Sequence, residues 1–171
     1  MDADTDVVAR CREPSNKTVA TMRAAALAAL SRYGLSRDSC DDAEIMAGEL
    51  LTNAIRHGAG PVAVLAWRCT LDCAVVEVHD ASPIQPVLPA PLAPAEVDPL
   101  AETGRGLPLV TALAKQRCGV AGRPEGGKSV WFALLLGRHT PSRLALAALV
   151  KSRIQCRGIS TPLTSPRASR P

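Results

Sequence analysis

The sequence has 171 residues, with 47% apolar and 21% charged side chains and a net charge of +4 at pH 7. These values fit one globular domain with a substantial core, and they exclude a disordered or fibrous protein. No apolar run approaches the roughly 20 residues that span a bilayer, and the acidic start MDADTDVVAR lacks the order of a signal peptide. We therefore expect a cytoplasmic protein without a membrane partner.

In chain order the sequence predicts a strand over 5–11, helices over 16–33 and 39–57, and a β-hairpin over 62–79. A long loop over 81–103, a helix over 104–115, a second hairpin over 118–136 and a short final helix over 142–154 follow. Gly34 and Gly58 end the first two helices, and Ser39 caps the second together with aspartates in its first turn. Six prolines in the long loop are typical of a functional segment or a linker. The order predicts an α+β fold, a two-layer α/β sandwich whose sheet is mixed but mostly antiparallel, with helices on one face.

The charge is distributed unevenly along the chain. Residues 137–171 contain six Arg, one Lys and no acidic residue, whereas residues 1–136 hold 13 basic and 16 acidic residues. A basic tail either binds nucleic acid or an acidic partner, or forms a solvated extension. Because no aromatic residue follows Phe132, we favour the extension and do not expect nucleic acid as a partner. The predicted units are a domain over 5–137 and a basic, partly disordered extension over 138–171.

Residues 122–129, GRPEGGKS, match the P-loop pattern G-x-x-x-x-G-K-[ST]. A P-loop requires a helix after its last residue, so that amides and the helix N-terminus surround phosphate oxygens. The run 130–136, VWFALLL, predicts a buried strand instead. No acidic residue that could hold magnesium follows Glu125, so we interpret the match as accidental.

The six cysteines stand at 11, 40, 69, 73, 118 and 156. Without a secretion signal they are expected to be reduced thiols. Cys69 and Cys73 form the one close pair, but no second Cys/His pair stands at zinc spacing, and we expect no metal there.

The second predicted helix is amphipathic. At about 100° per residue, one sector collects Glu49, Thr52, Asn53, Arg56 and His57, and the opposite sector collects Ala47, Leu50, Leu51 and Ala54. The apolar sector should pack on the sheet. A solvated polar face is the ordinary interpretation of the other, but Ile45 and Met46 lie on its side one turn earlier, which favours a ligand pocket.

Several motifs resemble those of the GHKL superfamily of ATPases, which includes DNA gyrase and histidine kinases. Residues 49–57 (ELLTNAIRH) resemble the N box, and 78–82 (VHDAS) and 104–110 (GRGLPLV) resemble the two glycine boxes. Residues 126–132 (GGKSVWF) resemble the family's last turn and strand. The ordered boxes make the resemblance specific. It covers about residues 5–136, is closest to the anti-sigma-factor serine/threonine kinases, and implies the Bergerat-type ATP-binding fold.

The resemblance implies ATP and Mg²⁺ as cofactors. It implies that Asn53 coordinates magnesium and that Glu49 is the catalytic base. Asp80 would accept a hydrogen bond from the adenine amino group, and residues 81–103 would form the lid over the nucleotide. His57 either assists the phosphates or caps its helix. The implied ATP-binding residues are Asn53, His57, Asp80, Ser82, Gly104, Arg105, Gly106, Leu107 and Ser129.

The first functional hypothesis is an anti-sigma-factor kinase that phosphorylates a serine of a protein antagonist and binds a sigma factor; a homodimer remains open. The turn at Ala81-Ser82-Pro83 lacks the family's usual glycines, which motivates a second hypothesis, a non-catalytic module that binds ATP and a partner. A sensor histidine kinase domain is disfavoured, because none of the three histidines lies on a predicted dimerisation helix pair.

Overall fold

The computed structural model describes residues 5–89 and 106–158. The elements are β1 (Thr5–Cys11), α1 (Asn16–Ser31), α2 (Arg37–His57), β2 (Val62–Cys69), β3 (Cys73–Asp80), α3 (Gly106–Leu113), β4 (Cys118–Gly122), β5 (Lys128–Leu135) and α4 (Arg143–Gly158). The strands form one sheet in the order β1-β2-β3-β5-β4. Every pairing between these strands is antiparallel. The predicted α+β sandwich is therefore confirmed, with β1 as an edge strand, although the described strands form a purely antiparallel sheet rather than a mixed one.

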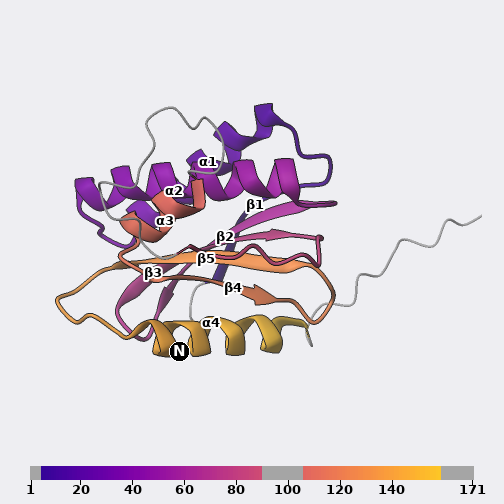
Figure 1. The fold of residues 1–171 in the computed structure, drawn as a ribbon. Coiled ribbons are helices and arrows are strands. Elements are labelled where there is room, and N and C mark those ends of the chain that lie inside the picture. The colour runs from indigo at the N-terminus through magenta and orange to yellow at the C-terminus, as the bar shows by residue number, and fades with distance from the viewer. Residues whose placement is uncertain (1–4, 90–105, 159–171) are drawn as a thin grey trace, which may run out of the picture.

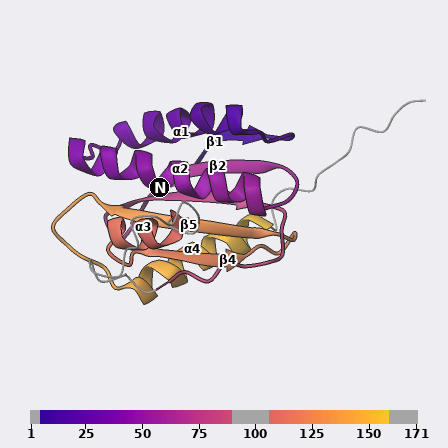
Figure 2. The same cartoon turned by 45° about the horizontal axis from the view of Figure 1, so that its top comes forward.

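Helices α1, α2 and α3 cover one face of the sheet (Figures 1 and 2). Of these, α2 begins at Arg37, two residues earlier than predicted, because the Ser36 hydroxyl accepts a hydrogen bond from the Ser39 amide and so serves as the N-cap. The predicted cap at Ser39 is wrong for this reason. The apolar sector of α2 is buried against the sheet as expected: Ala47, Leu50, Leu51 and Ala54.

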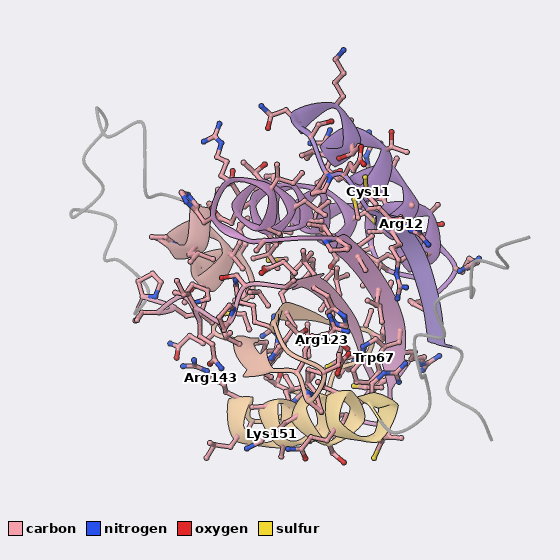
Figure 3. The ribbon with its side chains drawn as sticks, turned by 90° about the vertical axis from the view of Figure 1, so that its right-hand side faces the viewer. Cys11, Arg12, Trp67, Arg123, Arg143 and Lys151 are labelled. Atoms are coloured by element: carbon pink, nitrogen blue, oxygen red, sulfur yellow. The ribbon has the colours of Figure 1, made fainter. Side chains whose placement is uncertain are left out.

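The opposite face of the sheet carries α4 (Figure 1). Leu146, Val150 and Ile154 of this helix are buried in a cluster with the sheet residues Trp67 and Trp131. Figure 3 shows Trp67 between the sheet and α4, where the Arg153 guanidinium lies 3.9 Å from the centroid of its ring. The prediction of helices on one face thus holds for α1 to α3, but α4 adds a layer on the other. Part of the basic segment is consequently packed on the domain.

The segment that matches a P-loop is the turn between two antiparallel strands. Gly122 ends β4 and Lys128 begins β5, and a strand rather than a helix follows Ser129. The interpretation of the match as accidental is confirmed, because the helix N-terminus that a P-loop requires after Ser129 is replaced by strand β5. Within the described part of the chain, no helix has the length and apolarity to cross a membrane.

Candidate functional site

A pocket of about 180 Å³ lies between α2, the ends of β3 and β5, the segment after β3 and the first turn of α3. Most of its lining is apolar, from Leu50, Ala54, Val78, Ile84, Leu107 and Val130. Its polar lining residues are Asn53, His57, Asp80 and Lys128. An apolar pocket with a few converging polar groups is typical of a small-molecule site.

Asp80 and Lys128 form a buried ion pair at this pocket. They are directly opposite each other in the ladder between β3 and β5, and the Lys128 Nζ lies 2.8 Å from the Asp80 Oδ1. The exposed fractions of the two side chains are 7% for Lys128 and 1% for Asp80. Loss of either partner of such a buried pair is destabilising, because the other would remain as an uncompensated charge.

The turn after β3 is organised around the same carboxylate. The Ser82 amide donates to the Asp80 Oδ1 at 2.8 Å, and the Ser82 hydroxyl accepts from the Ile84 amide at 3.3 Å. Ser82 is buried and does not line the pocket. Its side chain braces the turn that holds Asp80, and its contact with a ligand stays a prediction.

A glycine from the facing hairpin packs on the backbone of Asp80. Gly127 has a φ of +82°, and a Cβ placed on it would lie 2.2 Å from the Asp80 carbonyl oxygen. Gly126 beside it has a φ of +94°, but a Cβ there would meet nothing within 4 Å. The two glycines thus share a left-handed backbone and differ in the space around them.

We expect Gly127→Ala to lower the free energy of unfolding by more than Gly126→Ala does. Both changes place a side chain on a left-handed backbone, which costs about 1–2 kcal/mol, but only the first forces a Cβ against the Asp80 carbonyl. Urea unfolding of the two variants and the wild type measures the difference. Equal destabilisation would show that the contact between Gly127 and Asp80 is not tight.

Glu49 and Asn53 lie one turn apart on α2 and both reach the start of α3. A Cβ placed on Gly106 would lie 2.4 Å from the Glu49 Oε2 and 3.4 Å from the Asn53 Nδ2. Glu49 and Asn53 are half-buried, and Asn53 lines the pocket. The amphipathic pattern of α2 correctly placed them side by side, and the first turn of α3 completes this end of the site.

The other predicted residues differ in their positions. His57, the last residue of α2, is exposed and lines the pocket. Leu107, in the first turn of α3, is half-buried and also lines the pocket. Gly104 and Arg105 lie outside the described residues, as does most of the predicted lid.

Ser129 points away from the pocket, to the α4 side of the sheet. Its hydroxyl donates to the Glu77 Oε2 at 3.0 Å. Successive side chains of a strand alternate between the two faces, so Lys128 and Val130 line the pocket and Ser129 cannot. The prediction of Ser129 as a ligand contact is wrong by one residue. The sequence did not identify Lys128 as a pocket residue, because its position opposite Asp80 follows only from the pairing of β3 with β5.

Glu77 is the centre of a buried polar network behind the pocket. Its carboxylate accepts from the Trp67 Nε1 at 2.6 Å and from Ser129, and it pairs with the His79 Nε2 at 2.9 Å. Burial by itself raises the pKa of Glu77, but the hydrogen bond and charge of His79 and the bonds from Trp67 and Ser129 outweigh it and lower the pKa below 4.5. The network ties β2, β3 and β5 together beneath α4.

The lowered pKa of Glu77 predicts a pH-dependent stability. A carboxyl group whose pKa is lowered by folding stabilises the fold above its unfolded pKa, here 4.5, and this contribution is lost as the pH falls toward the folded value. We expect Glu77→Gln to lower the free energy of unfolding at pH 7 by about 1–3 kcal/mol and to flatten its decline as the pH falls below the unfolded pKa of 4.5. Urea unfolding at several pH values tests this. The exposed Glu125→Gln should follow the wild-type profile, and a Glu77→Gln profile parallel to the wild type would contradict the assignment.

Residues 13–133 match the family model of the histidine kinase-like ATPase domain. The match covers 121 of the 171 residues. The chain belongs to this family. A comparison with individual curated proteins finds no match. Membership in the histidine kinase-like ATPase family implies ATP binding. All four polar residues of the pocket lie within the matched segment.

Proposed function

We propose that the chain is an ATP-dependent protein serine/threonine kinase of the anti-sigma-factor type. It transfers the γ-phosphate of ATP to a serine of a protein antagonist and regulates transcription by partner switching with a sigma factor in the cytoplasm. The observation that carries this proposal is the position of Glu49 beside Asn53, at the end of an ATP-family pocket and against the first turn of α3.

The residues of the pocket fit a nucleotide at both ends. Asp80 offers a buried carboxylate to the adenine amino group, and Val78, Ile84 and Val130 offer apolar surface to the ring. At the other end, the Asn53 amide and the N-terminus of α3 suit phosphates, because a helix N-terminus favours anions. The absence of a Cβ at Gly106 leaves room for this close approach to Glu49 and Asn53.

Asn53 is the candidate ligand for magnesium. Mg²⁺ prefers oxygen ligands and takes most of its negative ligands from the phosphates of the nucleotide. When bound, the ion supplies positive charge that neutralises the phosphate oxygens during transfer. A neutral amide from Asn53 complements such an ion without adding negative charge to the site.

Glu49 is positioned as the general base. The serine hydroxyl of the protein substrate attacks the γ-phosphorus, its O–H bond breaks as the new O–P bond forms, and the proton passes to the Glu49 carboxylate. The bond between the γ-phosphorus and the bridging oxygen breaks, and the electron pair leaves with ADP. Glu49 is half-buried, which keeps it accessible to a protein substrate.

A second candidate function is a non-catalytic module that binds ATP and a partner. It is favoured by the turn after β3, which two hydrogen bonds brace and which contains no glycine between Asp80 and Ile84. A stiff turn restricts the closure of a segment over ATP, and closure is what commits a substrate to transfer.

Incubation of the purified chain with γ-labelled ATP, Mg²⁺ and candidate antagonist proteins separates these functions. A kinase transfers label to a serine of an antagonist. A binding module leaves every candidate unlabelled, yet its binding to a partner depends on ATP. If ATP does not bind, both functions are excluded. A known serine kinase with its own substrate serves as the positive control for the assay.

A further inference from the structure

We propose that Lys128 is a specificity-determining residue that, together with Asp80, recognises the Watson–Crick edge of adenine. The inference rests on the proposed function for its ligand, ATP. It assigns to Lys128 a direct contact with the N1 atom of the base.

The first step is the hydrogen-bonding capacity of the ion pair. The Lys128 ammonium has three N–H donors, and one of them is directed at the Asp80 Oδ1 at 2.8 Å. Among the described residues, no other hydrogen bond involves this ammonium, although Lys128 lines the pocket. Donors thus remain for a bound ligand.

The second step is the capacity of Asp80. Both of its hydrogen bonds, from Lys128 and from the Ser82 amide, end on Oδ1. Within the described part of the chain, Oδ2 accepts none. The pair therefore offers the pocket an acceptor on Asp80 beside a donor on Lys128, and the two residues lie at paired strand ends.

The third step is the chemistry of the base. Adenine presents an amino donor beside the N1 acceptor, which is the complement of the acceptor and donor of the pair. Guanine presents a carbonyl acceptor beside an N1–H donor, so its carbonyl would face the carboxylate and its N–H would face the ammonium. A buried site built to hydrogen-bond one pattern strongly rejects the reverse pattern, because its own polar groups then remain unpaired.

The charge of Lys128 has a further consequence for the ligand. An unpaired Asp80 would place a negative charge in a pocket that receives a polyphosphate. With the ammonium at 2.8 Å the pair is neutral overall, so recognition of the base does not repel the anionic nucleotide.

Two analogues of ADP test the contact in the complete chain. In 1-deaza-ADP a C–H group replaces N1, and in 7-deaza-ADP a C–H group replaces N7, which the pair does not contact. We expect the wild type to bind 1-deaza-ADP at least about tenfold more weakly than ADP, the usual effect of losing a hydrogen bond to a charged group, and to bind 7-deaza-ADP as it binds ADP. GDP should bind more weakly still.

The variant Lys128→Met, which retains most of the side-chain length, assigns the effect to Lys128. It should bind ADP and 1-deaza-ADP equally, whereas Lys128→Arg should retain the preference for ADP. A structural role in joining β3 to β5 would weaken both ligands alike and leave their ratio unchanged. If Lys128→Met fails to fold, the wild-type preference for ADP over 1-deaza-ADP still tests the contact with N1, and a preference unchanged in Lys128→Ala would overturn the role of Lys128.

The outcomes separate this inference from the proposed function. Equal binding of ADP and 1-deaza-ADP by the wild type, or a preference that survives in Lys128→Met, overturns the role of Lys128 and leaves ATP binding intact. If the wild type binds no adenine nucleotide, the proposed function fails as well.

Discussion

Replacement of Asn53 by alanine is expected to weaken the binding of ATP in the presence of Mg²⁺ by about 100-fold or more, since even residues behind a metal ligand contribute 10- to 100-fold to metal affinity. Asn53 lines the pocket and is only half-buried, so the fold should survive. Calorimetric titration with ATP, with Mg²⁺ and with a chelator, measures the effect, and thermal unfolding verifies the fold.

Thr52 provides the matched control for this experiment. It is the preceding residue of α2, it is also half-buried, and it does not line the pocket. Thr52→Ala should therefore bind Mg²⁺ and ATP like the wild type. If Asn53→Ala also retains full affinity in Mg²⁺, the phosphates do not lie against α2 and the proposed site is wrong.

Replacement of Glu49 by glutamine is expected to slow phosphoryl transfer to the antagonist serine by about 10²- to 10⁴-fold, the usual contribution of a general base. The affinity for ATP should change little, because Glu49 acts on the attacking hydroxyl and not on the nucleotide. Transfer of γ-label measures the rate, and titration with ATP measures the affinity. Glu49→Gln should therefore lower the transfer rate and leave the affinity for ATP nearly unchanged.

Glu44→Gln is the control for Glu49. This residue lies on α2 more than one turn earlier, and its exposed side chain pairs with Arg23 at 3.5 Å, an interaction of little energetic consequence. It should leave transfer unaffected. If Glu49→Gln transfers phosphate as fast as Glu44→Gln, Glu49 is not the base. If neither variant transfers phosphate, the second candidate function, a non-catalytic binding module, gains support.

The sequence predicted the elements well where local rules decide them. Strand β1 begins and ends as predicted, and α2 ends at His57 before Gly58 as predicted. The error at the cap of α2 arose because Ser36 and Ser39 are both acceptable caps by composition, and only the hydrogen bond from the Ser39 amide to Ser36 identifies the cap.

The candidate site divides in the same way. Glu49 and Asn53 lie on one α-helix, so the helical repeat alone places them side by side. Asp80 lies on β3, whereas Lys128 and Ser129 lie on β5. The hydrogen-bonded residues Asp80 and Lys128 are 48 residues apart in the sequence. A shift of one residue along a strand reverses the face that a side chain occupies. The sequence resemblance therefore assigned the ligand contact to Ser129, whereas in the sheet it is Lys128 that lines the pocket.

The sequence also did not predict on which surface of the domain α4 packs. Its apolar residues predict a buried face, but several surfaces could bury that face equally well. Leu146, Val150 and Ile154 pack on the sheet because Trp67 and Trp131 offer a large apolar surface on the side that α1 to α3 leave uncovered.

The amino-acid sequence by itself determined the α+β class, the order of the elements and the polar face of α2, since these follow from periodicity, capping and turn residues within short segments. Tertiary structure alone decided that Asp80 pairs with Lys128, that Ser129 lies on the α4 side of the sheet, and that α4 covers the second face of the sheet. The physical reason is that strand pairing and layer packing are contacts between distant segments, whose register is set by the burial of the whole sheet rather than by any one stretch of residues.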